Sequence, residues 1–193
     1  MRSRLLVVLA AGLLTACQID TSRYPDSSPF KPVPVGSTLE LHQPITIPAD
    51  KLAVYLQGGR VLPYSDIDVT RAHCKFQLYR LSDKERTAHP DRFRITKVQH
   101  EETHSVSWAG VQFAAGRVGI GIHLHVGSSG GDSDGPSVRA FVTHLRLQSA
   151  NQPEVFRLSC GHVDDPGSNF LSIEQIRKVL GDVFALRTAE AGK

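Results

Sequence analysis

The fold class of this chain is indicated by residues 52–62, which run Leu52-Ala53-Val54-Tyr55-Leu56-Gln57-Gly58-Gly59-Arg60-Val61-Leu62. A short apolar run is typical of a strand, and a Gly-Gly pair is typical of a tight turn. These residues therefore predict a strand and a tight turn, with residues 61–62 as a candidate second strand.

Similar strand signals recur along most of the chain. Apolar residues alternate with other residues near period two, which favours half-buried strands. The clearest alternation lies in residues 118–126, and residues 138–147 form the next strand signal. Further signals lie in residues 39–41, 45–47, 74–81, 93–98, 106–113, 155–160 and 183–186.

One segment near the C-terminus has helical signals. Ser172 is a candidate N-cap and Gln175 its capping-box partner, while Gly181 is a natural stop. Its apolar face would contain Ile173, Ile176 and Leu180. About eight short strands and this helix predict a mainly β protein. We expect an antiparallel β-sandwich or a partly closed barrel with one short C-terminal helix.

The N-terminus has the features of an export signal. Two arginines precede an apolar run, and the run ends in Leu14-Thr15-Ala16-Cys17. This ending resembles the lipobox of bacterial lipoproteins. The resemblance implies cleavage before Cys17 and lipid on Cys17. Because Gln18 rather than aspartate follows, it also implies an outer-membrane location facing the periplasm.

The predicted domain organisation follows from this signal. Residues 1–16 would be the lipoprotein signal peptide, and residues 17–37, rich in proline and serine, would form a partly extended tether. A single β-rich domain would cover residues 38–188, followed by a short tail in residues 189–193. That length suits one domain.

Removal of the signal also changes the charge and the cysteine count. The chain has 22 basic and 19 acidic residues, and cleavage removes Arg2 and Arg4, which leaves a net charge of +1. This near-neutral balance argues against nucleic acid as a partner. Of the three cysteines, lipid on Cys17 would leave Cys74 and Cys160, which should form a disulfide in an oxidising compartment.

Histidines supply the candidate metal site. His123 and His125 share one face of their predicted strand, and a His-x-His pair can bind zinc or copper. His144 on the next predicted strand is a candidate third ligand. In an antiparallel hairpin, one register would place His144 beside this pair and the other would not. The alternative places both histidines on a solvent face without metal.

Two enzyme-like motifs have simpler interpretations. Residues 100–104 spell His-Glu-Glu-Thr-His, but the zinc-protease motif needs a helix, and the flanking pattern favours strands and a polar hairpin tip. Residues 127–131 match Gly-x-Ser-x-Gly, but a flexible loop fits the following Asp132, Gly135 and Pro136 better than a nucleophile elbow.

The sequence thus predicts a lipid-anchored envelope protein that binds or supports another component without being an enzyme. Its partners would be the membrane, through the lipid, and an envelope protein. The alternatives are a periplasmic metal-binding protein that uses the His-x-His pair, and a hydrolase whose site is dispersed along the sequence.

Overall fold

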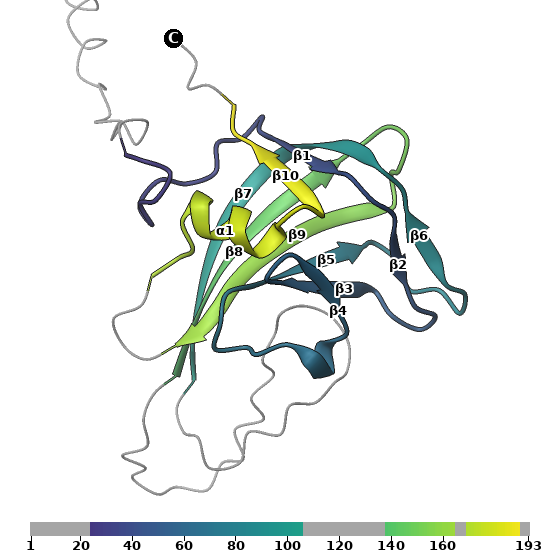
Figure 1. Cartoon of the computed structure of the whole chain (residues 1–193), viewed down its shortest axis with the longest axis horizontal. Helices are drawn as coiled ribbons and strands as arrows, with labels where there is room; N and C mark the ends of the chain where they lie inside the picture. Colours follow the sequence, from purple (N-terminus) through teal and green to yellow (C-terminus); the bar gives the residue numbers. More distant parts are fainter. Residues whose placement is uncertain (1–23, 106–137, 165–168, 190–193) are drawn as a thin grey trace, which may run out of the picture.

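The protein is described by a computed structural model that covers residues 24–105, 138–164 and 169–189 (Figure 1). Eight strands form one curved antiparallel sheet that closes part of a barrel. Their order is β10 (Phe184–Arg187), β1 (Thr38–Leu41), β7 (Asp91–Ser105), β8 (Val138–Gln148), β9 (Val155–Asp164), β5 (His73–Leu78), β3 (Ala53–Gln57) and β4 (Arg60–Leu62). This architecture confirms the predicted mainly β fold.

Four further elements complete the described part of the fold. Strands β2 (Ile45–Ile47) and β6 (Arg86–Ala88) pair as a small second sheet, and a 3-10 turn spans Tyr64–Asp66. The helix α1 (Ile173–Leu180) lies across the concave side of the large sheet (Figure 1). It contacts β3, β5 and β10.

The main core lies between this concave side and α1. Successive side chains of a strand point to opposite faces, so Cys74, Phe76 and Leu78 of β5 enter the core together. The ring of Phe76 lies 6.2 Å from that of Phe93 and 5.4 Å from that of Phe184, measured between centroids. The apolar face of α1 closes the core with the buried residues Ile173, Ile176, Val179 and Leu180.

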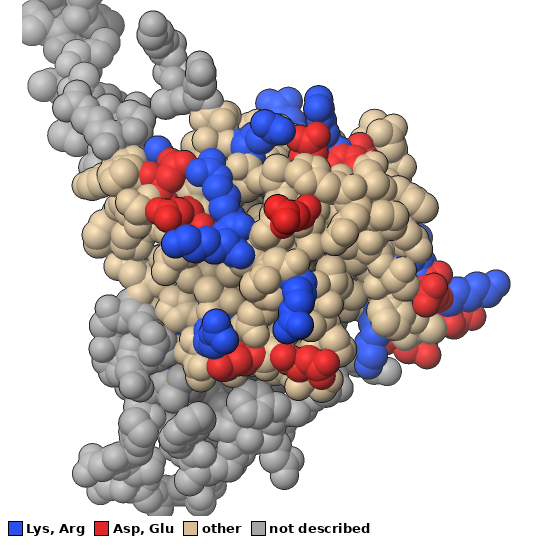
Figure 2. All heavy atoms as spheres, in the orientation of Figure 1, with Lys and Arg blue, Asp and Glu red and all other residues tan. Residues whose placement is uncertain are grey.

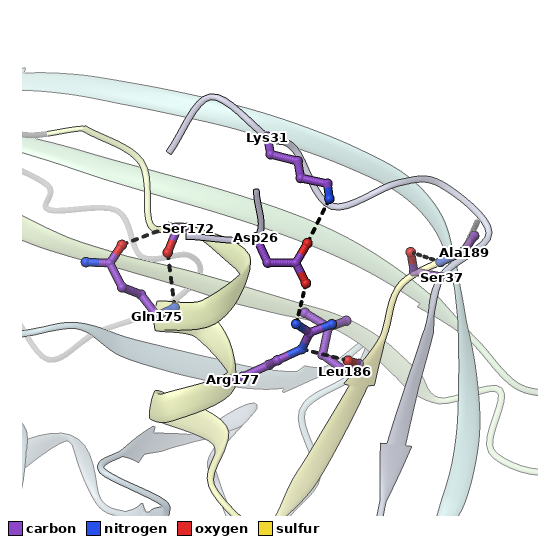
Figure 3. A network of polar contacts seen from close by, with 8 residues as sticks. All are labelled: Asp26, Lys31, Ser37, Ser172, Gln175, Arg177, Leu186 and Ala189. Carbon is purple, nitrogen blue, oxygen red and sulfur yellow. Dashed lines mark hydrogen bonds and ion pairs between the residues drawn. The ribbon is translucent and has the colours of Figure 1, made fainter. Parts of the chain in front are cut away.

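The predicted helix ends are confirmed. The Ser172 hydroxyl accepts a hydrogen bond from the backbone N–H of Gln175, and the Gln175 side chain accepts one from the Ser172 N–H (Figure 3). The helix stops at Gly181, which has a positive φ of 52°. A Cβ atom there would lie 2.5 Å from the Cα of Gly59, so only glycine allows this approach.

The predicted turn between residues 57 and 60 is confirmed as well. Gly58 and Gly59 both have positive φ, as required by the tight turn that matches the twist of a two-residue hairpin. The Gly59 N–H donates to the carbonyl oxygen of Val179 at 3.0 Å. This hydrogen bond joins the β3–β4 hairpin to the end of α1.

The Cys74–Cys160 disulfide is present and joins neighbouring strands. The two cysteines are directly paired in the β5–β9 ladder, with their Cα atoms 4.0 Å apart. They are separated by 86 positions in the sequence. The bridge therefore connects an early strand with a late one inside the core.

Residues 24–37, predicted as tether, lie against the domain. Val33 is buried, and the Gly36 N–H donates to the carbonyl oxygen of Ile95 at 2.8 Å. The backbone N–H of Glu174 donates to the carbonyl oxygen of Asp26. An extended tether would therefore be limited to the residues before Tyr24.

Two other local predictions differ from the structure, and one strand was not predicted. Residues 100–104 lie within β7 rather than at a hairpin tip, so the strand runs through to Ser105. The short strand β6 was not predicted, because Arg86-Thr87-Ala88 has no alternating large apolar residues. The strand β5 ends at Leu78, and Leu81 beyond it is exposed.

Candidate functional site

Polar side chains occupy the face of the large sheet opposite the main core. The strand register pairs Tyr55 with Lys75, Lys75 with Ser159, and Ser159 with His144. Directly paired residues point to the same face of a sheet, so these four side chains form one row across β3, β5, β9 and β8. We call it the polar row.

The polar row is unusual because most of it is buried. The exposed fractions of Lys75, Ser159 and His144 are 6%, 1% and 8%. The next positions on the same face of β5, His73 and Gln77, are also buried. Buried polar groups need hydrogen-bond partners, so their contacts indicate what this face does.

His144 connects two polar groups on this face. Its Nδ1 lies 2.8 Å from the Ser159 hydroxyl, and its Nε2 lies 2.9 Å from Oε2 of Glu101. Burial lowers the pKa of His144, although the hydrogen bond to Glu101 acts in the opposite direction. The ring is therefore neutral near pH 7. Because a carboxylate only accepts, Nε2 carries the proton, and Nδ1 accepts from the hydroxyl of Ser159.

In this Ser-His-Glu arrangement the serine donates to the histidine and the histidine donates to the carboxylate, as in a catalytic triad. The position of the serine in the fold does not favour catalysis. Ser159 lies in the middle of β9, and its side chain is shielded from solvent. The strand has neighbours on both sides, so the backbone groups around Ser159 face β5 and β8. The chain of hydrogen bonds instead fixes the partly exposed Glu101 carboxylate on this face.

Lys75 is a buried lysine whose charge has no ion-pair partner among the described residues. Within the described residues, its ammonium makes no hydrogen bond or ion pair, and its nearest ring contact is Tyr55, with Nζ 5.9 Å from the ring centroid. Burial and the neighbouring Arg157 guanidinium lower the pKa of Lys75 to about 8. A buried lysine is rarely left unpaired, because removing its charge from water is costly.

Arg157 supplies a second cation on this face. Its register partners are Gln77 and Arg146, and its Nε donates to Oε1 of Gln77 at 3.2 Å. Burial lowers the pKa of Arg157, while the charge of Glu101 raises it. The polar row and its neighbours thus hold Lys75, Arg157 and Arg146, and among the described residues the carboxylate that acts on Arg157 is that of Glu101.

An aromatic cluster adjoins these cations. The rings of Tyr79 and Phe156 lie 4.5 Å apart, and the Arg146 guanidinium lies over both. Arg157 also lies over the Phe156 ring, 5.0 Å from its centroid. Tyr79 is 47% exposed. This cluster therefore presents an aromatic edge and held guanidinium groups beside Lys75.

The structure describes one of the three predicted metal ligands. His144 is engaged at both ring nitrogens, and both edges of β8 are paired, with β7 and with β9. The predicted pairing of β8 with a preceding strand of a hairpin is therefore replaced by its pairing with β7 and β9. His123 and His125 lie outside the described residues, and their metal binding stays a prediction.

Some of the other candidate site residues lie within the described part of the chain and some lie outside it. In the described part of the chain, no three histidine, cysteine or acidic residues form a group that could hold a metal ion. His100 lies on β7, a strand rather than the helix that a zinc protease needs, and its ring packs edge-on against Phe170 at 4.7 Å. Cys17 and residues 127–131 lie outside the described residues.

Lys75, Ser159 and Glu101 were not predicted as site residues. Lys75 and Ser159 occupy polar positions of alternating strands, and Glu101 lies in a continuous polar stretch. Such positions ordinarily face solvent. The sequence signal was a lysine and a serine at polar positions directly beside the two cysteines, Lys75 after Cys74 and Ser159 before Cys160. Their burial becomes visible only when β5, β9 and β8 are placed side by side.

The surface also has two hollows beside α1. A cavity of about 430 Å³ lies at the start of α1 and is also lined by Ser27, Pro29, His162, Asn169 and Phe170. A smaller one of about 210 Å³ lies toward Gln57 and Arg71. On the face shown in Figure 2, acidic and basic side chains are interspersed. These hollows are open and contain no buried, unpaired charge comparable to Lys75.

Comparisons with known proteins add no family. No family model matches the chain, and neither the curated proteins nor the solved structures contain a significant match. Among the described residues, no helix has the length and apolar character needed to cross a membrane. The functional argument therefore rests on the residues of this chain.

Proposed function

We propose that this protein is a lipid-anchored, periplasm-facing binding module of the bacterial outer membrane, without enzymatic activity. The Leu14-Thr15-Ala16-Cys17 ending of the export signal supports the anchor. The observation that supports binding is the largely buried side chain of Lys75, whose ammonium has no ion-pair partner among the described residues. Its complement is an anionic group, a carboxylate or a phosphate, on an envelope component.

The surroundings of Lys75 favour such a ligand. Arg157 adds a second positive charge, and the exposed Tyr79 beside Arg146 offers an aromatic contact for the rest of the ligand. Aromatic and arginine side chains commonly dominate binding energy at interfaces. An anion would offset the cost of burying Lys75, so binding and stability of the domain should be linked.

The proposal predicts that inorganic phosphate stabilises the protein through Lys75. At constant ionic strength, replacing chloride with phosphate should raise the melting temperature of the native protein. A phosphate concentration about tenfold above its Kd would add about 1.4 kcal/mol to the free energy of unfolding. Lys75→Met should abolish this gain, as measured by differential scanning fluorimetry.

Lys97→Met provides the matched control. Lys97 lies on the same face, as the partner of Arg146, but its side chain is exposed. This variant should retain the phosphate effect. An equal gain in Lys75→Met and the native protein would refute the anion site, as would no gain in the native protein. Labelling of Ser159 by a fluorophosphonate probe would instead identify a hydrolase.

A further inference from the structure

Residues 24–35 carry three large apolar side chains on the surface. Tyr24, Phe30 and Val35 are 41%, 63% and 60% exposed, and the rings of Tyr24 and Phe30 lie 6.4 Å apart. We propose that these three residues, the anchor-side patch, seat the domain on the surface of the bilayer that holds the Cys17 lipid. This inference rests on the lipid anchor proposed above.

The segment that carries the patch is held firmly against the domain. The Asp26 carboxylate accepts from Lys31 at 2.8 Å and from the Arg177 guanidinium of α1 (Figure 3). These two cations lower the pKa of Asp26, so the carboxylate stays charged. Val33 is buried between the exposed Phe30 and Val35. The fold therefore fixes the exposed side chains in place and does not leave them on a loose tether.

The position of the patch in the chain identifies its partner as the bilayer. Only residues 18–23 separate Tyr24 from the cysteine of the lipobox. Even fully extended, this connection spans roughly 20–25 Å. The lipid thus keeps the patch close to the headgroup region for as long as the chain is anchored.

The side-chain chemistry of the patch suits that region. Tyrosine has an apolar ring with a polar tip, and such rings are enriched at membrane interfaces. Phenylalanine and valine gain free energy when their exposed surface leaves water, at roughly 25 cal/mol per Å². Because the lipid already confines the protein to the membrane, a small gain in free energy is enough to keep the patch in contact with the bilayer.

A fluorescence experiment tests this contact with the mature chain, residues 17–193. Because Cys74 and Cys160 form a disulfide, Cys17 is the remaining thiol of the three cysteines. It can be coupled to a maleimide lipid in vesicles of phosphatidylethanolamine and phosphatidylglycerol. In the Phe30→Trp variant, brominated acyl chains should quench the emission added by the new tryptophan.

Leu81→Trp is the matched control. Leu81 has a similar exposed fraction, 56%, but belongs to the connection between β5 and β6, on the opposite side of the view in Figure 1 from residues 24–37. Its added emission should not be quenched. Equal quenching of both variants, or no quenching in Phe30→Trp, would refute the proposed contact between the anchor-side patch and the bilayer. Self-association of the uncoupled protein that Phe30→Ser abolishes would assign the patch to a second copy instead.

The chemical coupling keeps this test independent of acylation in the cell. Acyl labelling of the full chain addresses the anchor itself, and Cys17→Ser should abolish the label. Label that persists in Cys17→Ser would refute the anchor proposal, whatever the vesicle result. Quenching that fails while the label depends on Cys17 would refute the seat alone.

Discussion

At the scale of single residues, the main result is the contrast between Lys75 and His144. Both are buried on the same face of the sheet. His144 is satisfied at both ring nitrogens, whereas the Lys75 ammonium makes no hydrogen bond within the described residues. The difference matters because a satisfied buried group stabilises its position, whereas an unpaired one costs free energy.

The cost of Lys75 predicts a pH dependence of stability. The folded-state pKa is about 8, against 10.5 for an ordinary lysine. Below pH 8 the charge is present in both states, and its burial penalty is complete. Between pH 8 and 10.5 the unfolded state binds more protons, so the free energy of unfolding should rise with pH.

Urea unfolding of the native protein and Lys75→Met at pH 7, 8, 9 and 10 measures this effect. Lys75→Met should be the more stable protein at pH 7, and the gap should narrow toward pH 10. Burial raises the pKa of Tyr55 to about 12, which would lower stability above pH 10, so the series ends there. Parallel curves for the two proteins would contradict the burial penalty.

At the scale of elements, the helix α1 depends on contacts at both of its ends. Its N-terminus has the Ser172–Gln175 capping box, and its C-terminus contacts the Gly58-Gly59 turn through Gly181. Arg177 ties the helix to neighbouring segments, since its Nε donates to the carbonyl oxygen of Leu186 (Figure 3). A helix of eight residues is too short to be stable alone, so these contacts and its apolar face hold it.

The capping box yields a prediction for α1. Ser172→Ala removes the hydroxyl that accepts from the Gln175 N–H, so the free energy of unfolding should fall by about 1 kcal/mol. Ser172→Thr, which keeps a hydroxyl, should retain most of the stability. Chemical denaturation of the three proteins measures the difference. If Ser172→Thr lost as much as Ser172→Ala, packing rather than capping would be responsible.

At the scale of the whole molecule, the sheet joins segments that are far apart in the sequence. The strand β9 pairs with β5, and β10 pairs with β1, although more than half of the chain separates β1 from β10. The Cys74–Cys160 bridge restricts the unfolded chain between these two cysteines, which are 86 positions apart. The disulfide should therefore contribute to the stability of the entire domain.

Removal of the bridge tests this contribution. In a Cys17→Ser background, replacing both Cys74 and Cys160 with alanine should lower the free energy of unfolding by up to about 4–5 kcal/mol, for a loop of 86 positions. Urea unfolding compares the two proteins, and reduction of the background protein should reproduce most of the loss. Unchanged stability after both treatments would show that the bridge does not restrain the unfolded chain.

Much of this architecture was predictable from local patterns. Strand periodicity, the Gly58-Gly59 turn and the Ser172 cap depend on residues close together in the sequence, so their signals are visible there. The Cys74–Cys160 pair was predictable because lipid on Cys17 would leave only two cysteines. The fold class followed from these local features.

The candidate site was less predictable because it depends on strand register. His144 was considered as a metal ligand, but the register places it between Ser159 and Glu101, with no edge of β8 left for another strand. Lys75 resembles an ordinary solvent-facing lysine in the sequence. A shift of one residue in register would move either side chain to the other face.

Local sequence patterns thus indicate most of the strands, the turn and the helix, because the forces behind them act between near neighbours, and they predict an export signal. Tertiary structure alone decides which strands become neighbours, which polar groups lose contact with water and that residues 24–37 pack on the domain. Those outcomes depend on burial by distant segments. Burial by those segments leaves the Lys75 side chain little exposed and without an ion pair among the described residues, and the packing of residues 24–37 leaves the anchor-side patch exposed.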